Sequence, residues 1–162
     1  MKCIVISDSH GEALALRRIL NMHPDCEVVF FLGDGLSDLE PYISNKNIAF
    51  FAVRGNCDRS FVLGDNAVKK TDSINIEGRR VVFTHGDLYG VKYGLDGIGK
   101  LALETSADVV LFGHTHEPLE KYVPTESGGF YLFNPGALGG YKQSFGIMNI
   151  TSDGVLLSHG SL

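Results

Sequence analysis

The chain has 162 residues, of which 44% are hydrophobic and 20% are charged, a balance typical of a folded globular protein. Its formal net charge of −5 argues against a long nucleic-acid groove, because such grooves rely on many contacts from Lys and Arg to phosphates. The length fits a single domain over residues 1–162, with room for a sizeable core.

The cysteines and the apolar runs bear on the cellular location. The three cysteines are odd in number, and their spacing matches no metal or redox motif. The apolar run near the N-terminus is too short for a signal-peptide core, and the longer runs are too short to span a membrane. We therefore expect a cytoplasmic protein without a membrane partner.

Strand and helix patterns alternate in the first third of the chain. Apolar runs predict strands at 2–6, 27–34 and 48–56, and helical spacing of apolar residues predicts a helix within 11–22. A short helix or turn is expected at 36–43. This alternation favours parallel strand pairing.

The later part of the chain is richer in predicted strands. We expect two strands within 73–86 joined at Glu77-Gly78, a helix at 95–106, a strand at 107–113, and hairpins at 119–136 and 145–160. Residues 59–70 and 87–99 are expected to be loops. The pattern predicts an α/β domain with either two layers of sheet or one large mixed sheet.

Five of the predicted strands share the same kind of ending. Each delivers a carboxylate, amide or imidazole at its carboxyl end: Asp8 and His10, Asp34, Asn56 and Asp58, His85 and Asp87, and His114 and His116. Sites in α/β sheets form outside the carboxyl ends of strands, so these groups would converge if the strands are neighbours.

Each block taken alone has a simpler interpretation, such as an Asx turn, a helix cap or a satisfied histidine. The recurrence favours a metal site instead, because four of the six histidines fall at strand ends. In an extended segment, His114 and His116 would point to the same side. They could bind one ion together, or one ion each in a pair roughly 3.5–4 Å apart.

Taken in order, the blocks Asp-x-His, Gly-Asp, Gly-Asn-x-Asp, Thr-His-Gly and Gly-His-Thr-His resemble the calcineurin-like metallophosphoesterase superfamily. The resemblance runs from Asp8 to His116 and extends through residues 133–140. It is strongest to the small bacterial and archaeal phosphodiesterase group. It implies a four-layer αββα sandwich, in which two mixed β-sheets are flanked by helices.

The resemblance also implies a ligand set for two metal ions. One ion would be held by Asp8, His10 and His116, the other by Asn56, His85 and His114, with Asp34 bridging both. Mixed imidazole and carboxylate ligands suit Mn²⁺, Fe²⁺, Zn²⁺, Co²⁺ or Ni²⁺, and the resemblance favours Mn²⁺. Two divalent ions would give the centre a positive charge, which would attract a phosphate despite the negative net charge of the chain.

The expected mechanism is in-line attack on phosphorus by a metal-bridging hydroxide. Asn56 is expected to help stabilise the developing charge, and His10 is one possible donor of the leaving-group proton. Many superfamily members carry a His at the position of Cys57. We expect Cys57 to be a small buried side chain without a catalytic role, so diesters with acidic leaving groups should react best.

Several further residues receive weaker assignments. Arg54, Arg59 and Tyr89 are candidate substrate contacts, although ordinary surface positions explain the arginines at least as well. Asp58 and Asp87 are expected either to orient a ligand or to sit in solvated turns. We expect His23 at the surface, a structural role for His159, and a tight turn at Asn134-Pro135-Gly136.

Three functions remain open at this point. A phosphodiesterase acting on a small phosphodiester or nucleotide-like substrate leads, followed by a phosphomonoesterase or nucleotide hydrolase on the same site. A non-catalytic metal-binding scaffold is the third, since a retromer subunit shares the fold. A zinc β-lactamase-like site is rejected, because Glu117-Pro118-Leu119 replaces the Asp-His expected after the histidine pair. The resemblance also allows a homo-oligomer.

Overall fold

The structure is a computed structural model that describes residues 1–59, 62–63, 66–126 and 128–162. Its helices are α1 (Ala13–Met22), α2 (Leu36–Leu39), the 3₁₀ helix η1 (Asp87–Tyr89) and α3 (Asp96–Thr105). Its strands are β1 (Lys2–Ile6), β2 (Val28–Phe31), β3 (Ala49–Ala52), β4 (Val62–Leu63), β5 (Asn66–Ala67), β6 (Thr71–Ile76), β7 (Arg79–Thr84), β8 (Val109–Leu111), β9 (Pro118–Thr125), β10 (Gly128–Pro135), β11 (Ser144–Ile150) and β12 (Val155–Ser161).

The first sheet has the strand order β12-β11-β1-β2-β3. β1, β2 and β3 pair in parallel, as the alternation of strands and helices predicted, with Cys3 opposite Val28 and Val28 opposite Ala49. β11 runs antiparallel to β1, and β12 returns along β11 as the expected hairpin. The sheet is therefore mixed, with β1 at its centre.

The second sheet has the order β6-β7-β8-β10-β9. The predicted turn at Glu77-Gly78 joins β6 to β7, with both residues at positive φ. β7, β8 and β10 are parallel neighbours, and β9 pairs with β10 as the expected hairpin. Both sheets are thus mixed, as the resemblance implied.

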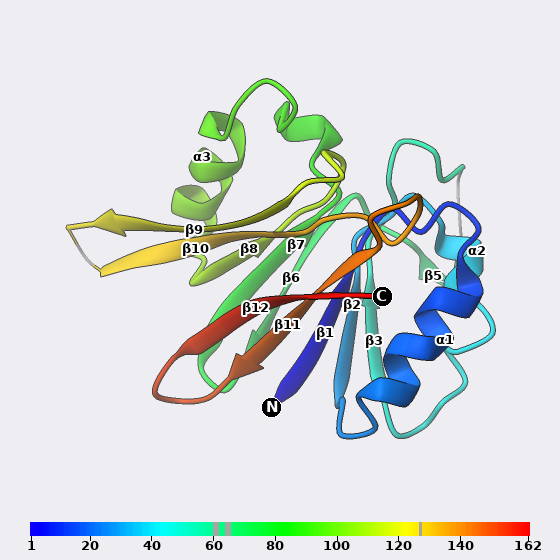
Figure 1. Cartoon of the computed structure of the whole chain (residues 1–162). Helices are drawn as coiled ribbons and strands as arrows, with labels where there is room; N and C mark the ends of the chain where they lie inside the picture. Colours follow the sequence, from blue (N-terminus) through cyan, green and yellow to red (C-terminus); the bar gives the residue numbers. More distant parts are fainter. Residues whose placement is uncertain (60–61, 64–65, 127) are drawn as a thin grey trace.

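The two sheets face each other, and helices cover their outer sides (Figure 1). Alternate side chains divide β1 between two cores: Val5 points into the layer between the sheets, whereas Ile4 and Ile6 pack toward α1. A third core lies between the second sheet and α3. This arrangement confirms the four-layer αββα sandwich.

The two predicted loops hold more structure than the sequence suggested. Within 59–70, β4 and β5 form a short antiparallel pair, while residues 60, 61, 64 and 65 lie outside the described residues. Within 87–99, η1 lies between Gly86 and Gly90, whose φ angles of 106° and 63° turn the chain sharply on either side. Such short elements lack the apolar periodicity that sequence patterns detect.

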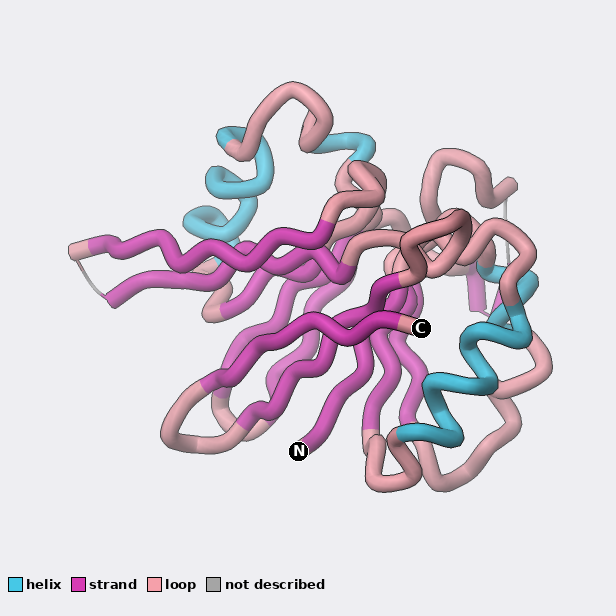
Figure 2. The backbone as a smooth tube through the Cα atoms, in the orientation of Figure 1, coloured by secondary structure: helices cyan, strands magenta, loops and turns pink. Residues whose placement is uncertain are grey.

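Among the described residues, no helix is both long and apolar enough to cross a membrane. The loops that follow β1, β2, β3, β7 and β8 gather at one end of the sandwich (Figure 2). The candidate ligands lie in these loops.

Candidate metal centre

The loops at the carboxyl ends of the strands are bonded to one another within each sheet and meet across the two sheets. The backbone N–H of Asp8 donates to Gly33 O at 2.9 Å, which joins the loop after β1 to the loop after β2. In the second sheet, Gly113 N donates to His85 O at 2.9 Å. A side chain at Gly113 would collide with Ser7 and with Asp8, so glycine allows the two sheets to meet at this point. The predicted convergence is therefore present.

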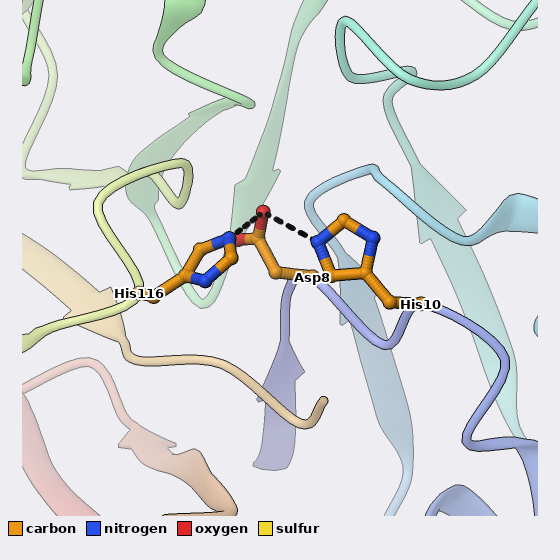
Figure 3. A group of neighbouring side chains, drawn as sticks. All are labelled: Asp8, His10 and His116. Atoms are coloured by element: carbon orange, nitrogen blue, oxygen red, sulfur yellow. Dashed lines mark hydrogen bonds and ion pairs between the residues drawn. The ribbon is translucent and has the colours of Figure 1, made fainter. Parts of the chain in front are cut away.

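Asp8, His10 and His116 form what we call the open group (Figure 3). Asp8 Oδ1 lies 3.0 Å from Nε2 of His116 and 3.8 Å from Nε2 of His10. The Asp8 side chain is fully buried, whereas those of His10 and His116 are 39% and 48% exposed. A carboxylate at the base and two imidazoles toward solvent leave this group accessible.

Asp34, His85 and His114 form what we call the buried group. His85 Nε2 lies 3.3 Å from Asp34 Oδ2 and 3.0 Å from Nδ1 of His114. The other ring nitrogen of His85, Nδ1, lies 2.8 Å from Leu32 O, a carbonyl that can only accept. Nδ1 therefore carries the proton, and in the neutral ring the lone pair of Nε2 faces the group. Asn56 Oδ1 adds a further oxygen 3.2 Å from this nitrogen.

The charges of the buried group influence one another. Burial alone would raise the pKa of Asp34, but the interaction with His85, which donates from Nε2 when the ring is protonated, and the hydrogen bond from the Cys57 backbone bring it below its usual range. Burial would lower the pKa of His85, but Asp34 and Asp8 outweigh this effect and raise it. Burial, His85 and Lys92 together lower the pKa of His114. Asp34 is thus ionised and His114 neutral, the forms that bind a cation.

Asp8 connects the two groups. Its Oδ1 lies 4.0 Å from His85 Nε2, while its Oδ2 accepts hydrogen bonds from Ser7 Oγ at 2.5 Å and from the backbone N–H of His114 at 3.0 Å. Each group offers one carboxylate and two imidazoles, with ligand atoms that all lie within 4.8 Å of one another. This donor chemistry fits two divalent transition-metal ions side by side.

The backbone at the ligands differs from the extended form that the sequence argument assumed. Among the described residues, five of the seven non-glycine residues with positive φ are candidate ligands: Asp8 (53°), His10 (46°), Asp34 (57°), His114 (69°) and His116 (62°). His114 and His116 consequently do not share a side, as they would in an extended strand: His114 lies in the buried group and His116 in the open group. Strained backbone of this kind concentrates at functional sites.

Comparison with known proteins identifies the family. The model of the calcineurin-like phosphoesterase superfamily domain matches residues 1–153. The chain belongs to this superfamily. YsnB of Bacillus subtilis, a probable metallophosphoesterase, is 32% identical over 138 residues, which cover 85% of this chain and 75% of YsnB. Phosphodiesterase YfcE of Escherichia coli is 29% identical over 172 aligned positions, covering 92% of this chain and 88% of YfcE.

A solved structure shares the fold of this calcineurin-like phosphoesterase. Wild-type Vps29 of Entamoeba histolytica, crystallised in complex with Zn²⁺, superimposes with a TM-score of 0.72 over 99% of each chain at 18% identity. At this identity the likeness concerns the fold alone. The family match confirms the resemblance of the ordered sequence blocks, and it supports a metal-dependent phosphoester hydrolase.

The expectation of a buried Cys57 is wrong, because this side chain is exposed. Its backbone N–H donates to Asp34 Oδ1 at 2.7 Å, which ties the main chain to the site, and the thiol remains at the surface. A hydrogen bond with Asp34, the slight desolvation of the thiol and the charges of nearby carboxylates raise the pKa of Cys57. Apolar spacing says nothing of the direction in which a turn side chain points, so the sequence could not settle this.

Asp58 and Asp87 hold the structure around the site rather than lying in solvated turns. The two carboxylate oxygens of Asp58 accept four backbone N–H groups, from Asp34, Gly35, Leu36 and Gly55, at 2.7–3.0 Å. Asp58 thus joins the loop after β2 to the loop after β3. Asp87 pairs with Lys70 Nζ at 2.8 Å.

The candidate substrate contacts are less closely tied to the metal groups. Arg54 is half-buried and Arg59 exposed, and within the described residues neither side chain is bonded to a candidate ligand. The Tyr89 hydroxyl lies 3.1 Å from Thr71 Oγ1, so it is directed toward β6.

The two remaining histidines lie outside both groups. The expected surface position of His23 is only partly correct, because its half-buried ring packs against Phe145. His159 is structural, as expected: its Nε2 lies 2.7 Å from Asn134 O, and its ring stacks on Phe133.

Proposed function

We propose that the protein is a dinuclear metal-dependent phosphodiesterase that hydrolyses a small phosphodiester or nucleotide-like substrate. The main support is the pair of adjacent Asp-His-His groups at the carboxyl ends of strands from both sheets. Asp8, His10 and His116 would hold one ion, and His85, His114 and Asn56 the other. Asp34 would bridge them.

When bound, the two ions would neutralise the phosphate and activate a water for in-line attack on phosphorus. The protein's own residues prepare this chemistry. The Leu32 carbonyl holds the proton of His85 on Nδ1, away from the ligand position. Asn56 is exposed beside His85, where its amide can contact a phosphate oxygen. His10, one of the two exposed imidazoles of the open group, is the proposed donor of the leaving-group proton.

The donor set admits Mn²⁺, Zn²⁺, Fe²⁺, Ni²⁺ or Co²⁺, and we propose Mn²⁺ on the basis of the family resemblance. Position 57 holds a cysteine where many superfamily members have a histidine. We therefore expect faster hydrolysis of diesters whose leaving groups need little protonation. Arg54, Arg59 and Tyr89 remain proposed contacts to the rest of the substrate. We also propose a cytoplasmic location, in keeping with three unpaired cysteines.

Two other functions are tested by the same experiment. A phosphomonoesterase or nucleotide hydrolase would use the same ligands with a different pocket. A scaffold role is raised by the shared fold with Vps29.

The protein would be stripped with a chelator and assayed on an aryl phosphodiester and the matching monoester, without metal and with Mn²⁺, Zn²⁺, Fe²⁺, Ni²⁺ or Co²⁺ added in turn. We expect Mn²⁺-dependent turnover that favours the diester. A preference for the monoester would favour the second function, and no turnover with any of the five ions would favour the third.

A further inference from the structure

Two buried polar side chains outside the ligand set, Asp38 and Asn134, share an arrangement. Each forms hydrogen bonds to the residues on both sides of one candidate histidine ligand. Asp38 does so around His10 of the open group, and Asn134 around His114 of the buried group.

Asp38 lies in α2 and is only 7% exposed. Its Oδ2 accepts hydrogen bonds from Ser9 Oγ at 2.6 Å and from the backbone N–H of Gly11 at 2.8 Å. One carboxylate oxygen therefore fixes the chain immediately before and after His10. Bonds to an ionised acceptor are stronger than neutral ones, and this one is largely shielded from water.

Asn134 lies near the end of β10 and is fully buried. Its Nδ2 donates to Gly113 O and to Thr115 Oγ1, both at 3.0 Å. Its Oδ1 accepts from Gly136 N at 2.9 Å, which forms the expected tight turn. The Asn134 amide nitrogen thus fixes the residues on either side of His114, and the amide oxygen stabilises the turn at Asn134-Pro135-Gly136.

Both histidines need such support because their backbone is strained. His10 has φ 46° and His114 has φ 69°, a region that non-glycine residues adopt only when the surroundings enforce it. His10 also has little packing of its own, with 39% of its side chain exposed. Its imidazole is therefore placed mainly by its backbone, which is held by the bond from His10 N–H to Asp34 O at 3.2 Å and, on both sides of His10, by Asp38.

We propose that Asp38 and Asn134 are positioning residues, Asp38 for the metal site of the open group and Asn134 for that of the buried group. The inference rests on the proposed two-metal function. Neither residue touches an ion in this proposal. Each acts through the main chain that presents one histidine, so each should influence one site more than the other.

The test is a titration of the metal-free protein with Zn²⁺, followed by calorimetry and by NMR of the histidine side chains. Zn²⁺ is diamagnetic, so the rings of His10 and His116 report one site and those of His85 and His114 the other. Asp38→Ala removes both acceptor bonds around His10, whereas Asp38→Asn retains an oxygen acceptor. Asn134→Asp keeps the acceptor for Gly136 but removes both donated bonds. Met148→Ala is the control, a core truncation opposite Cys3 at the far end of β1.

We expect Asp38→Ala to weaken Zn²⁺ binding at the open group by roughly 10- to 100-fold, the usual effect of losing a partner that orients a ligand. Binding at the buried group should change far less. Asn134→Asp should show the reverse selectivity, and Asp38→Asn should restore most of the open-group affinity. Met148→Ala should leave the affinities of both sites unchanged, even though it lowers the stability of the fold.

Equal losses at both sites in Asp38→Ala, or no loss at either, would overturn the inference. If Asp38→Ala does not fold, Ser9→Ala removes one of the two hydrogen bonds of Asp38 and should weaken Zn²⁺ binding mainly at the open group. Likewise, Thr115→Val removes one of the two hydrogen bonds donated by Asn134 and should weaken binding mainly at the buried group. Failure of the wild-type protein to bind two Zn²⁺ ions would instead overturn the two-metal function itself. The two failures are thus distinguished within one titration.

Discussion

Asp8 Oδ1 lies 3.0 Å from Nε2 of His116, although the two residues are 108 positions apart in the chain. Asp8 follows β1 in the first sheet, and His116 follows β8 in the second. The open group therefore exists only when the two sheets are packed together. A metal ion at this group would bind the folded chain far better than the unfolded chain.

Metal binding should consequently stabilise the fold. At a free Mn²⁺ concentration 100 times the dissociation constant, one site adds about 2.7 kcal/mol to the free energy of unfolding. For a protein of this size, that corresponds to a rise in melting temperature of roughly 5–10 °C. Calorimetry of the metal-free and Mn²⁺-loaded protein measures this shift. The double variant Asp8→Asn/His116→Ala should show a smaller rise, and an unchanged melting temperature in the wild type would contradict the prediction.

The two metal sites should differ in how firmly they hold an ion. His85 is fully buried and Asp34 nearly so, whereas His10 and His116 are 39% and 48% exposed. Dialysis of the loaded protein against a weak chelator should therefore remove one equivalent quickly and the second slowly, as measured by elemental analysis over time. His116→Ala should abolish the fast phase and retain the slow one. Release of both ions in one phase from the wild type would argue against this asymmetry.

Gly33 should tolerate no side chain. Its φ is +96°, and an added Cβ would lie 2.8 Å from Gly55 Cα and 2.9 Å from Arg54 C, both of them main-chain atoms. Gly78 has φ +76° but open space around it, so Gly78→Ala reports backbone strain alone, about 1–2 kcal/mol. Gly33→Ala should lose at least a further ~1–3 kcal/mol through the clash, as measured by urea unfolding. Equal losses in the two variants would show that the loops after β2 and β3 can separate without cost.

Cys57 should be the thiol that reacts first in the native protein. It is exposed, whereas Cys3 and Cys26 are buried, and burial raises the pKa of Cys3 to about 12. The hydrogen bond with Asp34, slight desolvation and neighbouring carboxylates raise the pKa of Cys57, so less thiolate is present at a given pH and alkylation is slow near neutrality. The alkylation rate of Cys57 should continue to rise with pH beyond the point at which the alkylation rate of a free cysteine becomes constant. Asp34→Asn should shift this pH dependence to lower pH. Mass spectrometry of iodoacetamide-treated protein identifies the site. Labelling of Cys3 or Cys26 before Cys57 would contradict the described fold.

Much of the fold and the clustering of the candidate ligands was predictable because both depend on local patterns. Apolar runs such as 28–31 and 109–111 mark buried strands, and each is followed three residues later by a side chain suited to metal binding, Asp34 and His114. The ordered blocks then indicated which of these residues belong together. The parallel pairing of β1, β2 and β3 followed from the intervening helices.

The rest depended on contacts between distant residues. The bonds from Ser9 to Asp38 and from Asn134 to Gly113 span 29 and 21 positions, and no spacing rule connects them. The left-handed backbone at His10 and His114 was missed for the same reason, because non-glycine residues adopt it only under tertiary constraint. The direction of the Cys57 side chain likewise depends on how its turn binds Asp34.

The most direct test of the two-metal site is anomalous diffraction from crystals of the protein loaded with Mn²⁺. Two peaks are predicted, one among Asp8, His10 and His116 and the other among Asp34, His85 and His114, close enough for one carboxylate to reach both. A single peak shared by all six residues, or no peak at either group under saturating Mn²⁺, would contradict a dinuclear site.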